Sequence, residues 1–270
     1  GKTVIDSRKK ELDSHIKKIR TRINSEYRRS MSEFVRYYTQ AKGGKDYVLG
    51  LEEISRRYAA NVREALAEAD AAYRQARINT VSTVGALLPS GGGDALKDLS
   101  RFSVRQPLSG EKETAIESAR RAFVEEARLM TGMLDSSPDA FFGGKMTPQQ
   151  YSYLMRMKND PFEAAKAGVN LPEWKKKVYG FDTYENSSAL LGNVLSRYEV
   201  AEDYALENAL TADIPEVIGY RIEVAKTNKY GRTRHRDICD ELAGDYPKDF
   251  VFKGWHYNCR CVVHPIIDKN

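Results

Sequence analysis

The sequence of 270 residues has few of the features that mark membrane, secreted or disulfide-bonded proteins. It contains three cysteines, and this odd number excludes a fully paired disulfide framework. No apolar run approaches the ~18–20 residues that a membrane-spanning helix requires, so we expect no transmembrane segment. No apolar stretch follows the first charged residues, so we expect no secretory signal. The first residue is Gly1 rather than methionine, and we expect the chain to be trimmed from a longer protein.

The sequence also lacks the common catalytic signatures. The nucleophile elbow G-x-S-x-G, the P-loop, the H-E-x-x-H zinc motif and the dinucleotide-binding fingerprint do not occur. Two weaker alternatives remain: a cysteine nucleophile with His256 or His235 as its base, and a metal-dependent nuclease that uses His256 with Asp237 or Asp240. The sequence around them provides no specific third group to orient either pair. We therefore expect a non-enzymatic protein.

Positive charge is concentrated at the N-terminal end of the chain. The formal net charge is +5, and residues 1–36 hold eleven basic and five acidic residues, a local charge of +6. Such a segment favours a phosphate-bearing or acidic partner, although mixed charges are also common on an exposed, solvated helix face. The candidate contacts to nucleic acid or to a partner protein are Lys9, Lys10, Lys17, Lys18, Arg20, Arg22, Arg28 and Arg29.

Apolar residues with helical spacing dominate the first two thirds of the chain. From Leu12 onward they recur every three or four residues, which predicts a long helix that ends at Gly43 and Gly44. Further helices are expected over 51–84, 111–134 and 186–211, and short helices are expected to begin at Thr147, Asp160 and Pro172. In the last long helix we expect an inward face made of Leu190, Leu191, Val194, Tyr198, Ala201, Ala205 and Ala209. His15 lies between charged residues and is expected to be exposed.

The spacing of the apolar residues changes from a helical period to strict alternation after Pro215. Residues 217–225 alternate in polarity and predict a strand with Ile218, Tyr220, Ile222 and Val224 on one face. A turn over 227–231, a short helix over 233–242 and strands at 250–252 and 261–263 should follow. The expected fold is mainly α, with an elongated helical body and a small C-terminal α+β module. We divide it into a helical hairpin or arm (1–86), a loop or hinge (87–110), a helical domain (111–212) and the α+β module (213–270).

A metal site is the strongest chemical candidate, because all three cysteines and three of the four histidines lie in the last 36 residues. His235 and Cys239 would share one helix face at spacing i, i+4, and Cys259 and Cys261 would share one strand face at i, i+2. Together they could form a tetrahedral zinc site, with His256 as the alternate fourth ligand. The alternative is a set of hydrogen-bonded histidines and small core cysteines without metal.

The same region carries a family resemblance. Residues 232–244 (RTRHRDICDELAG) and 255–261 (WHYNCRC) occur in this order with a short spacer between them. Over about 190–267, the chain resembles the phage Mu F-like head morphogenesis domain of minor head and minor capsid proteins. In that family the first segment contains an arginine–threonine pair, then a histidine, and then a cysteine or aspartate that is followed by aspartate. The second segment ends with H-P-N-C-R-C. Tyr257 stands here in place of the family's proline.

The resemblance implies a structural role. Members of this family are encoded beside the portal and the scaffold, are present in few copies near the portal inside the head, and are needed for head assembly or DNA delivery. For this chain, we therefore expect portal and other capsid proteins as partners, contact with packaged double-stranded DNA, oligomers in the virion, and assembly in the host cytoplasm, which suits unpaired thiols. Similar domains are also fused to toxins, so a phage-associated toxin or nuclease is the alternative.

Overall fold

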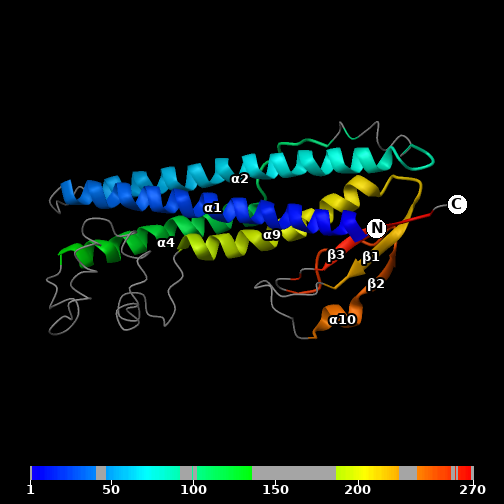
Figure 1. Ribbon diagram of the computed structural model, residues 1–270. Helices are drawn as coiled ribbons and strands as arrows, with labels where there is room; N and C mark the ends of the chain where they lie inside the picture. Colours follow the sequence, from blue (N-terminus) through cyan, green and yellow to red (C-terminus); the bar gives the residue numbers. More distant parts are fainter. Residues whose placement is uncertain are drawn as a thin grey trace. The chain divides into compact units, whose positions relative to one another are not determined.

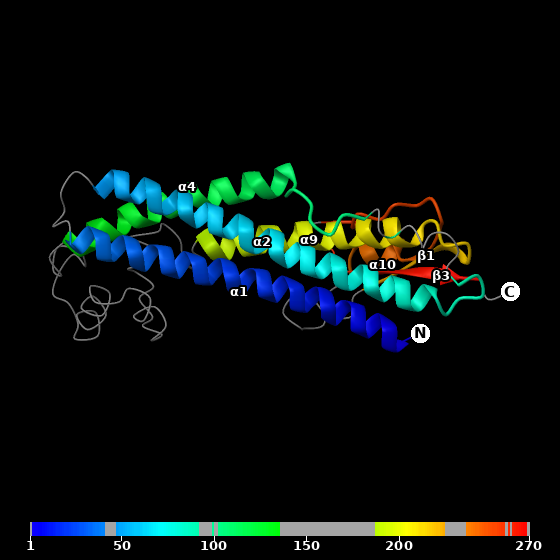
Figure 2. The same cartoon turned by 90° about the horizontal axis from the view of Figure 1, so that it is seen from above.

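The fold is mainly helical, with a small three-stranded antiparallel sheet near the C-terminus, as the sequence predicted (Figures 1 and 2). The computed structural model describes residues 2–40, 47–91, 99, 102–135, 187–224, 236–256, 259 and 261–268. The short helices predicted to begin at Thr147, Asp160 and Pro172 and the turn predicted over 227–231 lie outside these residues.

The described residues include four long helices, whose bounds are close to those predicted. These are α1 (Lys2–Gln40), α2 (Tyr47–Gly85), α4 (Gly110–Asp135) and α9 (Ser187–Thr211). Residues 86–91 form turns after α2, in the segment predicted as a loop. Contacts divide the chain into two compact units. Unit 1 comprises Gly1–Ile19, Leu66–Leu108 and Val194–Asn270, and unit 2 comprises Arg20–Ala65 and Ser109–Asn193.

Unit 2 is held together by aromatic and aliphatic side chains at helical spacing. Tyr27 of α1, Tyr58 of α2 and Phe123 of α4 are buried, and each of the three rings contacts the other two at centroid distances of 5.1–6.2 Å. The predicted stripe of α1 is confirmed, because its residues in this unit are buried: Ile23, Tyr27, Met31, Phe34 and Tyr38. Burial of such side chains is the main stabilising contribution to a helical unit.

The predicted inward face of α9 is only partly correct, because Leu191 is buried as predicted but other residues of this face are not. Leu190 is 49% exposed, and Ala205 and Ala209 are also exposed. The buried face of α9 in unit 1 instead includes acidic residues at one-turn spacing: Glu199, Asp203 and Glu207. Their charges meet basic side chains of α1 and α2, and such pairing is what allows acidic groups to be buried.

The C-terminal part of unit 1 contains the sheet. Strand β1 (Val217–Glu223) is central and pairs antiparallel with β2 (Gly244–Pro247) on one side and β3 (Val262–Ile267) on the other. Helix α10 (Ile238–Leu242) precedes β2. The expected strand at 250–252 is not present, because the chain pairs with β1 earlier, at Gly244–Pro247.

The predicted inward face of β1 needs one correction. Tyr220 and Ile222 are buried as expected, but Ile218 is 55% exposed. The register shifts between Val217 and Gly219, so Val217 enters the core in place of Ile218. Gly219 is required at this point, because a Cβ atom there would lie 2.4 Å from the carbonyl oxygen of Tyr246.

Candidate metal centre

The three cysteines come together in the folded chain. Cys239, Cys259 and Cys261 are between 2% and 4% exposed, and their three Sγ atoms lie within 4.8 Å of one another. The Sγ atoms of Cys239 and Cys259 are 3.7 Å apart. All three thiols are free. Three buried sulfur ligands at this separation form a candidate site for a thiophilic metal ion.

Helix α10 positions the first thiol. Asp237 caps the helix and accepts a hydrogen bond from the backbone N–H of Cys239 at 2.8 Å, and Asp240 completes the capping box. The cap places Cys239 in the first turn of the helix. Because Arg236 and Asp237 precede the helix, the prediction that His235 and Cys239 share a helix face is wrong. His235 itself lies outside the described residues.

The other two thiols lie just before β3 rather than within it. Strand β3 begins at Val262, so Cys259 and Cys261 do not share a strand face as predicted. A turn positions Cys259, whose N–H donates to the carbonyl of His256 at 3.0 Å. Gly254 has φ +93°, and a Cβ atom there would lie 3.2 Å from Cβ of Cys259. The hydroxyl of Tyr204 donates to the carbonyl of Cys261.

The environment of the thiols differs from one to the next. A hydrogen bond from the Cys261 thiol lowers the pKa of Cys259, whereas burial raises the pKa of Cys239. The pKa of Cys261 is raised, since its thiol donates to Cys259 and is also buried. Cys259 is therefore the thiol that ionises first, and the thiolate is the form that binds metal.

His256 lies at the edge of the thiol cluster. Its side chain is 34% exposed, and its Nε2 atom is 3.6 Å from a carboxylate oxygen of Asp237. Ligand atoms of Asp237, Cys239 and His256 lie within 4.8 Å of one another. Cys239 belongs both to this group and to the three thiols. Among the described residues, His256 is thus the histidine grouped with one of the three thiols, that of Cys239, and it is the candidate fourth ligand, with Asp237 beside its ring.

The candidate basic contacts all lie on α1. The structure leaves most of these side chains exposed, while Lys9 and Arg28 are half-buried. Some are engaged within unit 2: Arg20 donates to the side chain of Asn193 at 2.9 Å, and Arg29 is 3.0 Å from Glu26. Lys10, Lys17 and Lys18, all in unit 1, remain available at the surface as predicted contacts.

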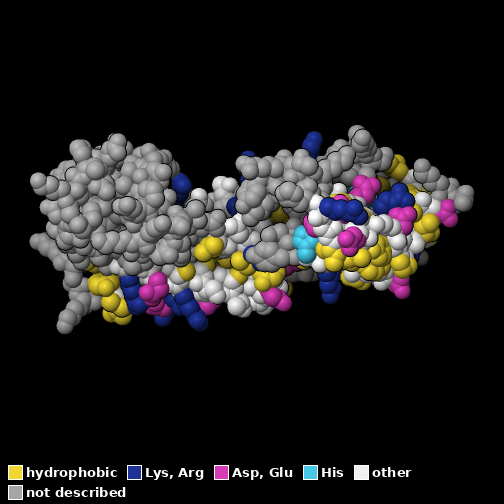
Figure 3. Space-filling view, turned by 90° about the horizontal axis from the view of Figure 1, so that it is seen from below, with side chains coloured by type: hydrophobic (Ala, Val, Ile, Leu, Met, Phe, Trp, Pro, Cys, Tyr) yellow, Lys and Arg dark blue, Asp and Glu magenta, His cyan; other side chains and the backbone are white. Residues whose placement is uncertain are grey.

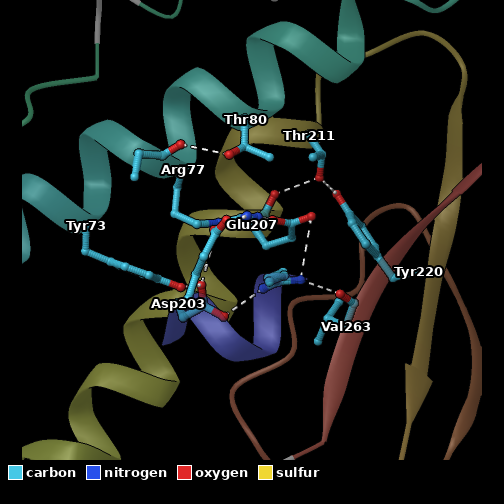
Figure 4. A network of polar contacts seen from close by, with 11 residues as sticks. Tyr73, Arg77, Thr80, Asp203, Glu207, Thr211, Tyr220 and Val263 are labelled. Atoms are coloured by element: carbon cyan, nitrogen blue, oxygen red, sulfur yellow. Dashed lines mark hydrogen bonds and ion pairs between the residues drawn. The ribbon is translucent and has the colours of Figure 1, made fainter. Parts of the chain in front are cut away.

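Sequence reasoning missed a network of buried charges in unit 1 (Figure 4). Arg8 of α1 lies 2.8 Å from Asp203 of α9, and Arg77 of α2 donates to Glu207 of α9. Tyr73 donates its hydroxyl to Asp203 at 2.7 Å. Burial lowers the pKa of Arg8, but the charges of Glu207 and Asp203 outweigh this effect and raise it, so the guanidinium stays charged.

The network also connects the helices to the sheet. Arg8 donates to the carbonyl of Val263 in β3, and the hydroxyl of Thr211 lies 3.1 Å from that of Tyr220 in β1. Figure 4 shows the labelled residues of this network, which come from α2, α9, β1 and β3, close to one another. The acids at positions 199, 203 and 207 recur once per helical turn, and this spacing is the sequence signal that could have revealed a buried charged face.

His15 was expected to be exposed, and this prediction is wrong. It is 5% exposed, its ring stacks on Tyr73 at 4.4 Å, and its Nε2 atom lies 2.8 Å from Glu199 and 3.4 Å from Asp70. Burial lowers the pKa of His15, but hydrogen bonds with the two carboxylates outweigh it and raise the pKa to about 9. The acidic partners come from α2 and α9, far away in the sequence.

Exposed apolar side chains gather on the C-terminal part of unit 1. Figure 3 shows hydrophobic side chains clustered at this end, with acidic and basic side chains interspersed around them. Ile238 and Leu242 of α10 are 47% and 37% exposed, and Val251 is 55% exposed. Contiguous exposed apolar surface of this kind is typical of protein contact sites.

No described helix combines the length and apolar character needed to span a bilayer. Comparison with family models, with curated proteins and with solved structures finds no match to the chain. The site described above therefore rests on the residues of this chain alone.

Proposed function

We propose that this chain is a structural minor head protein of a tailed phage or prophage, which acts at or near the portal in head assembly and DNA delivery. One observation carries the proposal. The two segments that resemble the Mu F-like head morphogenesis domain are separated in sequence, yet their chemistry-bearing residues meet in the folded chain. Asp237 and Cys239 of the first segment lie beside His256 and Cys259 of the second.

The metal centre is proposed to hold zinc. Zinc in structural sites is bound by four cysteine and histidine ligands, and three buried thiols with a histidine at their edge match this preference. Cys239, Cys259 and Cys261 are the sulfur ligands in this proposal, and His256 is the fourth ligand. The ion would connect α10 to the segment before β3 and so stabilise this small module.

The proposed partners are the portal and other capsid proteins. The exposed apolar side chains of α10, Ile238 and Leu242, supply a surface suited to such a partner. A structural protein of the head interior also agrees with the exposed lysines of α1, which suit contact with packaged DNA. The proposed location is therefore the virion, after assembly in the host cytoplasm.

The proposal predicts a stable complex with the portal protein encoded beside this chain. The two proteins, co-expressed with a tag on this chain, should co-purify in a fixed ratio. Exchange of Ile238 and Leu242 for aspartate should abolish co-purification, because charged groups would enter an apolar contact. A matched control exchanges an exposed acid of the same helix, Glu241→Gln, and should keep the complex. A parent chain that binds no portal protein would refute the proposal.

A metal-dependent nuclease is the second candidate, favoured by the proximity of His256 and Asp237. The same purified chain should be incubated with double-stranded DNA and Mg²⁺, Mn²⁺ or Zn²⁺. A structural protein leaves the DNA intact. Cleavage that disappears in His256→Asn and persists in His264→Asn would favour the nuclease instead.

The exposed lysines of α1 should bind duplex DNA without sequence preference. We expect binding of random duplex DNA, followed by fluorescence anisotropy, to weaken steeply with salt, because bound lysines release counterions from phosphates. The triple variant Lys10→Gln, Lys17→Gln, Lys18→Gln should reduce the slope of log affinity against log salt by about 0.9 per lysine that contacts phosphate.

The control for this experiment removes basic charge elsewhere. Arg121 and Arg128 of α4 are 76% and 51% exposed, and their exchange for glutamine should change the salt slope little. Equal slopes for the lysine variant and the parent chain would show that the basic segment of α1 does not contact DNA.

A further inference from the structure

Helix α9 carries buried acids at two levels of unit 1. Asp203 and Glu207 form one level with Arg8 and Arg77, while Glu199 lies one turn away and forms the other. Glu199, Asp203 and Glu207 are between 3% and 5% exposed. Both levels are built in the same way, from one face of α9 and the facing side chains of α1 and α2.

The two levels differ in their basic groups. At the first level, the guanidinium groups of Arg8 and Arg77 pair with the carboxylates of Asp203 and Glu207, and Arg77 also lies 3.9 Å from Glu11. At the second level, the imidazole of His15 lies beside the carboxylates of Glu199 and Asp70. A neutral imidazole and two carboxylates together carry a charge of −2, which a bound divalent cation would balance.

The geometry of the second level suits such a cation. The Nε2 atom of His15 offers one N–H or one lone pair, yet it lies 2.8 Å from an oxygen of Glu199 and 3.4 Å from an oxygen of Asp70. The three ligand atoms all lie within 4.8 Å of one another. Bonds of 2.0–2.2 Å to a metal separate neighbouring ligand atoms by about 3.0–3.5 Å, close to these distances.

The surroundings hold the ligands in place. Tyr73 stacks on the ring of His15 with an interplanar angle of 12° and is itself held by its hydrogen bond to Asp203. The side chain of Glu199 is 4% exposed, whereas that of Asp70 is 15% exposed, so the site reaches solvent on the α2 side.

We propose that His15, Asp70 and Glu199 form a binding site for one divalent transition-metal ion, distinct from the thiol centre. Imidazole and carboxylate ligands suit Mn²⁺, Fe²⁺, Co²⁺ and Zn²⁺, and a site without sulfur accepts Mn²⁺, which thiolate sites disfavour. The ion binds one ligand from each of three helices and fixes the packing of α1, α2 and α9 in unit 1. The site is independent of the proposed assembly role and of the zinc centre.

The test uses Mn²⁺ and the full chain, first stripped of metal with a chelator. Electron paramagnetic resonance follows the loss of the free Mn²⁺ signal as protein is added. We expect one equivalent of Mn²⁺ to bind to the parent chain and none to Glu199→Gln, which keeps the shape of the side chain. Glu202→Gln changes a half-buried acid on the same helix outside the cluster, and it should still bind one equivalent.

Two further measurements keep the outcome clear. Mn²⁺ should raise the melting temperature of the parent chain and of Glu202→Gln but not that of Glu199→Gln, and circular dichroism should confirm that each variant is folded. If Glu199→Gln does not fold, Asp70→Asn replaces it. A parent chain that binds no Mn²⁺, or ligand variants that bind it as tightly as the control, would overturn the site. Neither result would affect the thiol centre, which Cys259→Ser tests separately.

Discussion

Replacing Asp203 by asparagine should lower the free energy of unfolding by about 3–5 kcal/mol, the usual cost of removing one partner from a buried ion pair. Asp203 is 3% exposed, lies 2.8 Å from Arg8 and accepts a hydrogen bond from Tyr73. Without its charge, the buried guanidinium of Arg8 loses its shortest ion pair, and the position of Tyr73 beside His15 is weakened. Urea unfolding of the parent and variant chains, followed by circular dichroism, measures the difference.

A double-mutant cycle distinguishes the ion pair from a general effect of substitution. Arg8→Met removes the partner charge, so the double variant should be less destabilised than the sum of the single variants by at least about 1 kcal/mol. Glu202→Gln, at the neighbouring position of α9, should change stability by no more than about 0.5 kcal/mol. Additive effects of Arg8→Met and Asp203→Asn would contradict the assignment of a coupled buried network.

Removal of zinc should have the second large effect. An ion that binds only the folded chain contributes about 4 kcal/mol when free zinc is 1,000-fold above its dissociation constant. A strong chelator should therefore lower the melting temperature by roughly 8–16 °C, given about 2–4 °C per kcal/mol for a protein of this size. The variants Cys259→Ser and Cys239→Ser should each contain one fewer equivalent of zinc than the parent chain by elemental analysis. In thermal unfolding, each should show the same fall in melting temperature as the chelator causes in the parent chain.

Histidine variants test the fourth ligand of the proposed zinc centre. His256→Asn should weaken zinc binding, whereas His264→Asn should leave it unchanged, because His264 faces Glu223 at 3.7 Å on the sheet. Full zinc content in both cysteine variants, or an unchanged melting temperature in chelator, would mean that the three cysteines are ordinary core residues. If His256→Asn alone binds zinc as tightly as the parent chain, only His256 is removed from the proposed set of ligands.

The family resemblance and the candidate metal site were predicted from two different features of the sequence. The order of residues in the two C-terminal segments carries the resemblance, and the clustering of cysteines and histidines near the end of the chain predicts a metal site. Neither specifies which histidine meets the thiols. Helix α10 begins at Ile238 with Asp237 as its cap, so the helix predicted from residue 233 does not include Arg236 and Asp237, whereas the N–H of Cys259 donates to the carbonyl of His256 beside the cluster.

The sequence by itself determined the elements that follow from regular spacing. The apolar spacing from Leu12 to Tyr38 predicts α1 and a buried face, which the structure buries from Ile19 onward, and the alternation after Pro215 predicts β1. These predictions succeed because the period of a helix or strand is a local property of the backbone, and apolar side chains report which face is removed from water.

Only the tertiary structure decided which charged residues are buried. Arg8, His15 and Glu199 look like surface residues in sequence, since burial of a charged group is unfavourable when it is unpaired. Their burial depends on partners that come from other helices, and periodicity within one helix carries no information about what another helix presents. The same reason explains why part of the predicted face of α9 is exposed: Ala205 and Ala209 face solvent, whereas Glu199, Asp203 and Glu207 face basic side chains.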